Sequence, residues 1–286
     1  MRFSADIADY FTFNKREPLA ALVLLKALYL VALAKLLNVW VASDVVFADF
    51  SKAIPESWLT RIILSGSTLG GSNIDLFVGI FAAFLVFALV FRPDYRINIV
   101  FFWFELNYFR MLHPVSNGSD YIMLALAMLA IPLASRPGYA SARFQIVSTG
   151  LFNFSRIMIK IQILSVYFIS GWDKLINPAW RSGEAFEYIA HLETMFHPAF
   201  GPLLESEAMQ FTLSWMTIGF ELLFIPLVLI ARTRLAILAV GVGFHIVIWL
   251  MFGLPGFAWV MIVSYAIFLK DRDFDRFPKW IRPSPL

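Results

Sequence analysis

The sequence predicts an all-α, polytopic integral membrane protein with about eight transmembrane helices in one domain over residues 1–286. Three observations predict this class. The first is composition: 60% of the residues are hydrophobic and only 15% are charged, a balance that excludes an ordinary soluble domain. The second is the recurrence of apolar stretches close to the roughly 20 residues that a bilayer requires. The third is an uneven distribution of Lys and Arg between the loops, which a membrane topology explains.

The first expected span covers residues 18–42. Its apolar region is too long for a cleaved signal peptide and contains Lys26 and Lys35. The other spans are expected, in chain order, at residues 76–91, 97–112, 121–135, 145–175, 209–231, 235–252 and 257–270. Four of these are short, whereas 145–175 is long enough to be tilted. We expect eight spans, with seven as the alternative.

An even number of spans places both termini and every second loop on one side of the membrane. That side carries most of the basic residues: Arg2, Lys15, Arg16, Arg92, Arg96, Arg136, Arg143, Arg232, Arg234, Lys270, Arg272, Arg276, Lys279 and Arg282. The opposite loops contain only Lys52, Arg61 and Arg181. Because Lys and Arg accumulate in cytoplasmic loops, we expect a multi-pass cell membrane protein with both termini in the cytoplasm.

Several chemistries are not expected. The chain has no cysteine, so thiol nucleophiles and Cys-ligated metals are impossible. His191 and His197 are six residues apart and do not share a helical face as a metal-binding pair would. The glycines of SGSTLGGSN lack the following Lys and Ser/Thr of a phosphate-binding loop. We therefore predict no metal and no nucleic-acid partner. The triplet Asn117-Gly118-Ser119 matches a glycosylation acceptor, but we interpret it as a tight turn.

The most distinctive segment is YFISGWDKLINPAWRSGEAFEYI, which ends the fifth span. At 3.6 residues per turn, Tyr167, Gly171 and Lys174 share one face, and Asp173 points elsewhere. A glycine on that face allows either a neighbouring helix or a flat ligand to approach. Trp172 and Trp180 suit the membrane–water boundary. On periodicity alone, Lys174 is a residue that anchors its helix at this boundary.

The segment QILSVYFISGWDKLINPAW, followed by RSGEAFEYI, resembles the signature of the HTTM family, which includes vitamin K-dependent gamma-glutamyl carboxylase. Downstream, Glu221 falls where the family carries an intramembrane acid, and GFHIVIWLMFGLPGFAWVMI resembles a later family segment. The resemblance implies that Lys174 is a catalytic base that acts on reduced vitamin K or a menaquinol-like hydroquinone on the non-cytoplasmic side. The implied quinol-binding candidates are Tyr167, Gly171, Trp172, Trp180, Asn117, Glu221, His245 and Trp249.

The sequence also departs from the carboxylase pattern. Asp173 replaces a second lysine of the carboxylase, and Ser119 corresponds in this resemblance to an active-site histidine. The chain stops shortly after Lys270, where the carboxylase continues with a large lumenal portion. Two function classes follow. The first is a carboxylase-like enzyme with the bilayer, a quinone and a secreted or membrane peptide as partners. The second is a non-catalytic or transport-type protein for peptide maturation, export or immunity.

Other polar residues inside the expected spans need partners, because an isolated charge is costly in hydrocarbon. We expect Glu105 to form an ion pair with Lys35 or Lys160. We expect Glu221 and His245 to face the helix bundle and not the lipid.

Overall fold

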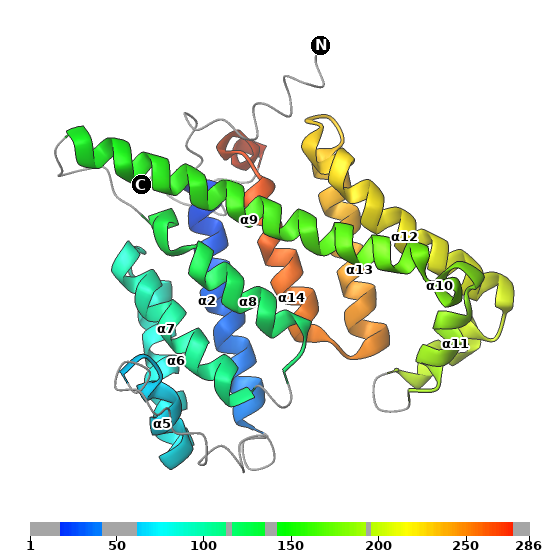
Figure 1. Ribbon diagram of the computed structural model, residues 1–286, viewed down its shortest axis with the longest axis horizontal. Helices are drawn as coiled ribbons and strands as arrows, with labels where there is room; N and C mark the ends of the chain where they lie inside the picture. The colour runs from blue at the N-terminus through cyan, green and yellow to red at the C-terminus, as the bar shows by residue number, and fades with distance from the viewer. Residues whose placement is uncertain (1–17, 42–61, 113–115, 135–141, 193–195, 277–286) are drawn as a thin grey trace. The chain divides into compact units, whose positions relative to one another are not determined.

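In the computed structural model, residues 18–41, 62–112, 116–134, 142–192 and 196–276 are described, and their regular elements are all helical. Four helices are long and apolar enough to cross a membrane: α2 (Pro18–Trp40), α9 (Ala142–Ile176, through its part from Ile146), α12 (Glu207–Leu229) and α13 (Arg234–Phe252) (Figure 1). These lengths and compositions are those of an integral membrane protein.

The four other expected spans also form helices. They are α6 (Ile74–Val90), α7 (Tyr95–Leu112), α8 (Gly118–Leu129) with the 3₁₀ turn η2 (Ile131–Ala134), and α14 (Pro255–Ser264) with the 3₁₀ turn η4 (Tyr265–Phe268). Every stretch that we expected to be a span is therefore helical, with ends shifted by a few residues. How many of these four helices cross the bilayer stays a prediction.

Five short elements were not predicted: α5 (Ser65–Ser72), α10 (Pro178–Ser182), α11 (Glu184–Ala190), η3 (Pro198–Leu204) and η5 (Asp271–Arg276). The glycine-rich α5 forms because Asn107 of α7 binds its first turn. The Asn107 Oδ1 atom accepts a hydrogen bond from Ser67 N at 2.7 Å. A Cβ atom at Gly66 would lie 2.8 Å from Asn107 Cγ, so glycine permits this approach.

The chain forms two compact units, one from residues 160–268 and the other from the described residues of 13–159 and 269–286. In the second unit, aromatic rings pack α6 against α7, with Phe81 stacked on Phe104 at 4.6 Å between centroids. Lys26 of α2 donates hydrogen bonds to Ala88 O and Leu89 O, each at 2.8 Å. The Lys26 ammonium thus satisfies carbonyl groups that the end of α6 leaves without an intrahelical donor.

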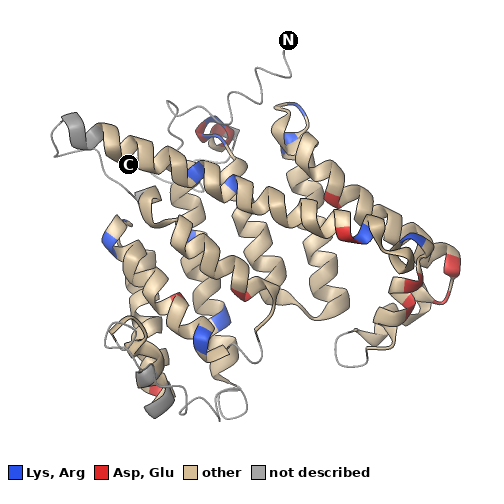
Figure 2. Cartoon of the chain, viewed as in Figure 1, with Lys and Arg blue, Asp and Glu red and all other residues tan. Residues whose placement is uncertain are grey.

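The first unit contains α10 to α14 and the second half of α9. Beyond the end of α9, the short helices α10 and α11 meet at Gly183, which has φ +96°. A Cβ atom there would lie 2.6 Å from Phe211 N, so both conformation and space require glycine. Charged residues are few along the described helices (Figure 2). In the first unit, a lysine and a glutamate, Lys174 and Glu221, form an ion pair.

Candidate functional site

Lys174 of α9 and Glu221 of α12 form a shielded ion pair. The Lys174 Nζ atom lies 3.0 Å from both carboxylate oxygens of Glu221. Ser170, one turn earlier on α9, accepts a hydrogen bond from Lys174 Nζ at 2.5 Å and donates one to Glu221 Oε1 at 3.0 Å. The side chains of Lys174 and Glu221 are only 17% and 9% exposed. The three side chains therefore form a closed polar triangle in mostly apolar surroundings.

Gly171 brings the two helices of this pair together. A Cβ atom at Gly171 would lie 3.0 Å from Leu222 Cγ and 3.1 Å from Glu221 Cβ. Any larger residue would therefore push α12 away. The sequence predicted that Gly171 lets either a neighbouring helix or a flat ligand approach. In the structure the neighbour is helix α12, which covers the face of Gly171.

Trp180 of α10 lies beside Lys174. The Lys174 Nζ atom is 5.0 Å from the centroid of the Trp180 ring, a cation–π distance. This position follows from local sequence, because Asn177 caps α10 by accepting a hydrogen bond from Ala179 N, and Pro178 begins the new helix. By contrast, Trp172 is 49% exposed and stacks on Phe168. Asp173 is exposed, as its register predicted.

A second polar layer lies one helical turn from Ser170, at Tyr167. The Tyr167 hydroxyl is hydrogen-bonded to His245 Nε2 of α13 at 2.7 Å and to the Tyr265 hydroxyl of η4. The ring of Phe224, from α12, stacks on Tyr167 at 4.1 Å. His245 and Glu221 are buried, with exposures of 1% and 7%. Both side chains thus face the inside of their unit, as expected for polar groups at this depth.

The other two quinol-binding candidates, Trp249 and Asn117, make different contacts. Trp249, one turn after His245, packs edge to face on Trp259 at 5.8 Å and is 38% exposed. Asn117 belongs to the other unit, where it is the N-cap of α8. Within the first unit, the group around Lys174 contains five of the candidates, Tyr167, Gly171, Trp180, Glu221 and His245. Ser170, Phe224 and Tyr265 join them there.

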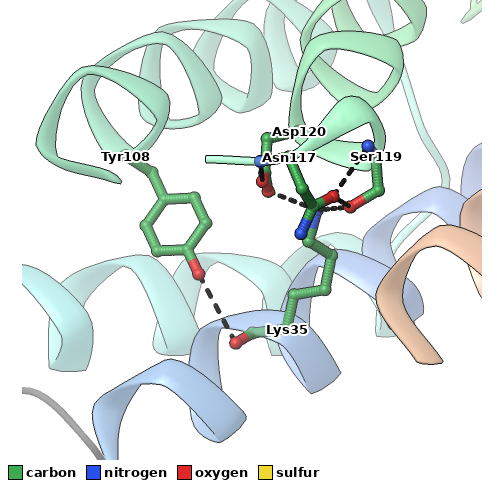
Figure 3. Close-up of polar contacts among 5 residues, drawn as sticks. All are labelled: Lys35, Tyr108, Asn117, Ser119 and Asp120. Carbon is green, nitrogen blue, oxygen red and sulfur yellow. Dashed lines mark hydrogen bonds and ion pairs between the residues drawn. The ribbon is translucent and has the colours of Figure 1, made fainter. Parts of the chain in front are cut away.

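Asn117 lies at the start of α8, where a second partly buried lysine, Lys35, binds the two polar residues that follow it (Figure 3). The Lys35 Nζ atom donates hydrogen bonds to Asp120 Oδ1 at 2.6 Å and to Ser119 Oγ at 3.1 Å. The Asp120 Oδ2 atom accepts a hydrogen bond from Asn117 N at 2.8 Å, which completes a capping box. The expectation for Lys35 was therefore wrong: its ion-pair partner in the described part of the chain is Asp120 and not Glu105. Spacing within spans could not find Asp120, because it lies at the start of a helix.

Sequence reasoning also missed Ser170 and Tyr265. A signal for Ser170 was present, because it precedes Lys174 by four residues and shares its helical face. Tyr265 had no local signal, since only tertiary packing brings it to Tyr167. Within the described ranges, no group of three or more His, Cys, Asp or Glu residues could hold a metal ion.

An apolar helical bundle with shielded lysine–carboxylate pairs defines the class, a polytopic α-helical membrane protein. A model of the HTTM domain matches residues 14–272, and the chain belongs to this family. HTTM is the domain shared with gamma-glutamyl carboxylase. No curated protein matches the chain, and no solved structure does.

Proposed function

We propose that the protein is a vitamin K-dependent carboxylase-like membrane enzyme in which Lys174 removes a proton from a lipid-soluble hydroquinone. The observation that carries this proposal is the triangle of Lys174, Ser170 and Glu221. It holds the amine at a fixed point in apolar surroundings, next to a group that can share its proton. Family membership supports the reaction type.

A lysine acts as a base only when its amine is neutral. In this proposal the proton that the pair shares resides on the Glu221 carboxyl group when the base acts, which leaves a lone pair on Lys174 Nζ. The amine then takes the hydroxyl proton of the reduced quinone, so the quinol becomes an anion and Lys174 becomes an ammonium that stays hydrogen-bonded to Glu221. The reduced quinone would supply the hydroxyl proton and the reducing electrons.

The ligand would approach Lys174 from the side of Trp180. α12 covers Gly171, whereas the Trp180 ring offers a flat aromatic surface 5.0 Å from the amine. Such a surface suits a quinone ring, because aromatic rings pack well face to edge or offset. A secreted or membrane peptide is the proposed acceptor of the subsequent chemistry.

The test compares two substitutions of Lys174 in purified protein supplied with a reduced menaquinone and oxygen. Lys174→Ala should lower quinol oxidation by about 100-fold or more, the usual contribution of a general base. Lys174→Arg should fail similarly, because a guanidinium keeps its proton, although it can still pair with Glu221. Tyr188→Phe, at a position that is 64% exposed and outside the candidate site, is the control and should keep wild-type turnover.

The alternative function predicts a different pattern. If Lys174 only anchors α9 or locks it to α12 in a non-catalytic or transport-type protein, Arg should replace it with little loss. Wild-type turnover by Lys174→Arg would therefore exclude the base mechanism. Absence of quinol oxidation in the wild-type protein would exclude the proposed enzyme class.

We also propose that this site lies on the non-cytoplasmic side, with both termini in the cytoplasm, from the distribution of Lys and Arg between the loops. Single cysteines test this cleanly, because the chain has none. An impermeant thiol reagent added to intact cells should label a cysteine at Ser206 and should not label one at Ser284. The reverse labelling would show that the orientation is inverted.

A further inference from the structure

Three buried polar side chains form a hydrogen-bonded series that ends at a nitrogen without a hydrogen-bond partner among the described residues. Tyr265, Tyr167 and His245 are 4%, 2% and 1% exposed, and the Tyr167 hydroxyl joins the other two. In this series, the Nε2 atom of His245 is the one hydrogen-bonded to Tyr167. The Nδ1 atom is buried and has no hydrogen-bond partner among the residues that the structure describes. Because an unsatisfied buried nitrogen is unfavourable, this atom marks a position for a ligand.

The surroundings of His245 restrict the kind of ligand. The rings of Phe244 and Phe257 stand edge to face with the imidazole at 5.3 and 5.6 Å. A metal ion would need further ligands, and no group that could supply them occurs in the described ranges. A flat apolar ring that carries an oxygen atom fits both the aromatic walls and the single open nitrogen.

We infer that His245 Nδ1 binds a ring oxygen of the quinone, and that Tyr167 and Tyr265 let this nitrogen serve both redox states. The inference rests on the proposed function, which makes a quinone the ligand. It concerns binding at His245 and does not depend on Lys174 being the base.

The reason lies in the direction of the hydrogen bonds. A neutral imidazole has one donor nitrogen and one acceptor nitrogen. When Tyr265 donates to Tyr167 and Tyr167 donates to Nε2, the Nδ1 atom carries the hydrogen and can donate to a carbonyl oxygen of the oxidised ring. When Nε2 donates to Tyr167 and Tyr167 donates to Tyr265, the Nδ1 atom can accept from a hydroxyl of the reduced ring. Both arrangements hold the same hydrogens and the same net charge.

Gly241 of α13 leaves room for Tyr265, the first residue of this hydrogen-bonded series. It lies one turn before His245, and a Cβ atom at this position would lie 2.8 Å from Tyr265 Cζ. Any side chain larger than hydrogen would therefore displace the Tyr265 ring from Tyr167. Gly241 thus positions Tyr265 without itself contacting the ligand.

The test measures binding and not turnover. A short-chain menaquinone, oxidised or chemically reduced under anaerobic conditions, is titrated into the protein in lipid nanodiscs, and quenching of tryptophan fluorescence gives Kd. In His245→Gln the amide can replace Nε2 toward Tyr167 but leaves nothing at Nδ1. We expect affinity for both redox forms to fall by about tenfold or more.

Tyr265→Phe tests the direction of the hydrogen bonds in this series. It removes the group that must accept from Tyr167 when Nδ1 accepts from the reduced ring. We expect about tenfold weaker binding of the reduced form alone. Tyr188→Phe is the matched control: Tyr188 is 64% exposed, and this variant should bind both forms like the wild type.

Wild-type affinity in His245→Gln, or equal weakening of both forms in Tyr265→Phe, would overturn the inference. A measurement on the wild-type protein covers the case in which a variant does not fold. The four histidines are labelled with ¹⁵N, and the His245 signals, assigned through substitutions of the other three, should show opposite tautomers with the oxidised and reduced ligand. One tautomer in both states would contradict us. If no quinone binds, the proposed function fails too; if the binding pattern holds but Lys174→Arg is fully active, only the base mechanism fails.

Discussion

Lys35 and Lys174 are both shielded lysines that pair with a carboxylate from another helix. The two carboxylates differ in their other hydrogen-bond partners. Asp120 binds Lys35 with one oxygen and the backbone N–H of Asn117 with the other. Glu221 uses both oxygens for Lys174 and one of them also for Ser170. The first carboxylate is thus part of a helix cap, and the second has only side-chain partners.

This difference underlies our proposal that one pair is structural and the other takes part in proton transfer. Protonating Asp120 would weaken the start of α8, because the cap depends on the charged carboxylate. The hydrogen bonds of Glu221 in the described residues are to the side chains of Lys174 and Ser170, so moving a proton between Glu221 and Lys174 weakens no helix cap. For this reason we place the chemistry at Lys174 and give Lys35 a structural role.

The largest effect is expected from Asp120→Ala. It removes the carboxylate that forms an ion pair with the Lys35 ammonium, together with half of the capping box. The free energy of unfolding should fall by about 3–5 kcal/mol, as for other broken buried pairs. Thermal unfolding in detergent would measure it. Unchanged stability would mean that Lys35 reaches water or another partner, and the comparison would fail.

Glu221→Gln should act on turnover more than on stability. Glutamine keeps the length of the side chain and can still accept the hydrogen bond of Ser170, but it cannot exchange a proton with Lys174. Quinol oxidation per folded molecule should fall by about 100-fold. The matched control is Asp120→Asn, the same change of carboxylate to amide in the structural pair. It should lower stability and leave turnover per folded molecule unchanged; equal losses of turnover in both variants would remove the distinction.

The smallest effect is expected from Asn117→Ala. The Asn117 Oδ1 atom accepts hydrogen bonds from Ser119 N at 2.9 Å and Ser119 Oγ at 2.6 Å. Loss of this N-cap should cost about 1 kcal/mol, which thermal unfolding would detect. Because Asn117 was also a candidate for quinol binding, affinity for a menaquinone should be measured in parallel. Weaker binding with unchanged stability would assign Asn117 to the ligand site after all.

The sequence was most informative where a single helix decides the outcome. Periodicity along α9 correctly placed Tyr167, Gly171 and Lys174 on one face and Asp173 on another, because a helix fixes the angles between its own residues. It also located all the long helices, since hydropathy needs no knowledge of neighbours.

It failed where two helices meet. Glu221 was recognised as an intramembrane acid but not as the partner of Lys174. Of the two lysines offered as partners of Glu105, Lys35 pairs with Asp120 instead, and pairing of Glu105 with Lys160 stays a prediction. Nothing in the spacing of residues along one helix encodes which helix packs beside it. The short helix α5 was missed for the same reason, because its stabilising contact comes from Asn107, far along the chain.

The partners of the α2 lysines also have a consequence for biogenesis. Lys26 depends on carbonyl groups beginning at Ala88, and Lys35 depends on Asp120, which are 62 and 85 residues later in the chain. During synthesis, α2 therefore leaves the ribosome with two charges whose partners have not yet been made, and charges in hydrocarbon are costly. We therefore expect the α2 lysines to find these partners only after α6 and α8 have been made, so that the packing of α2 is completed late.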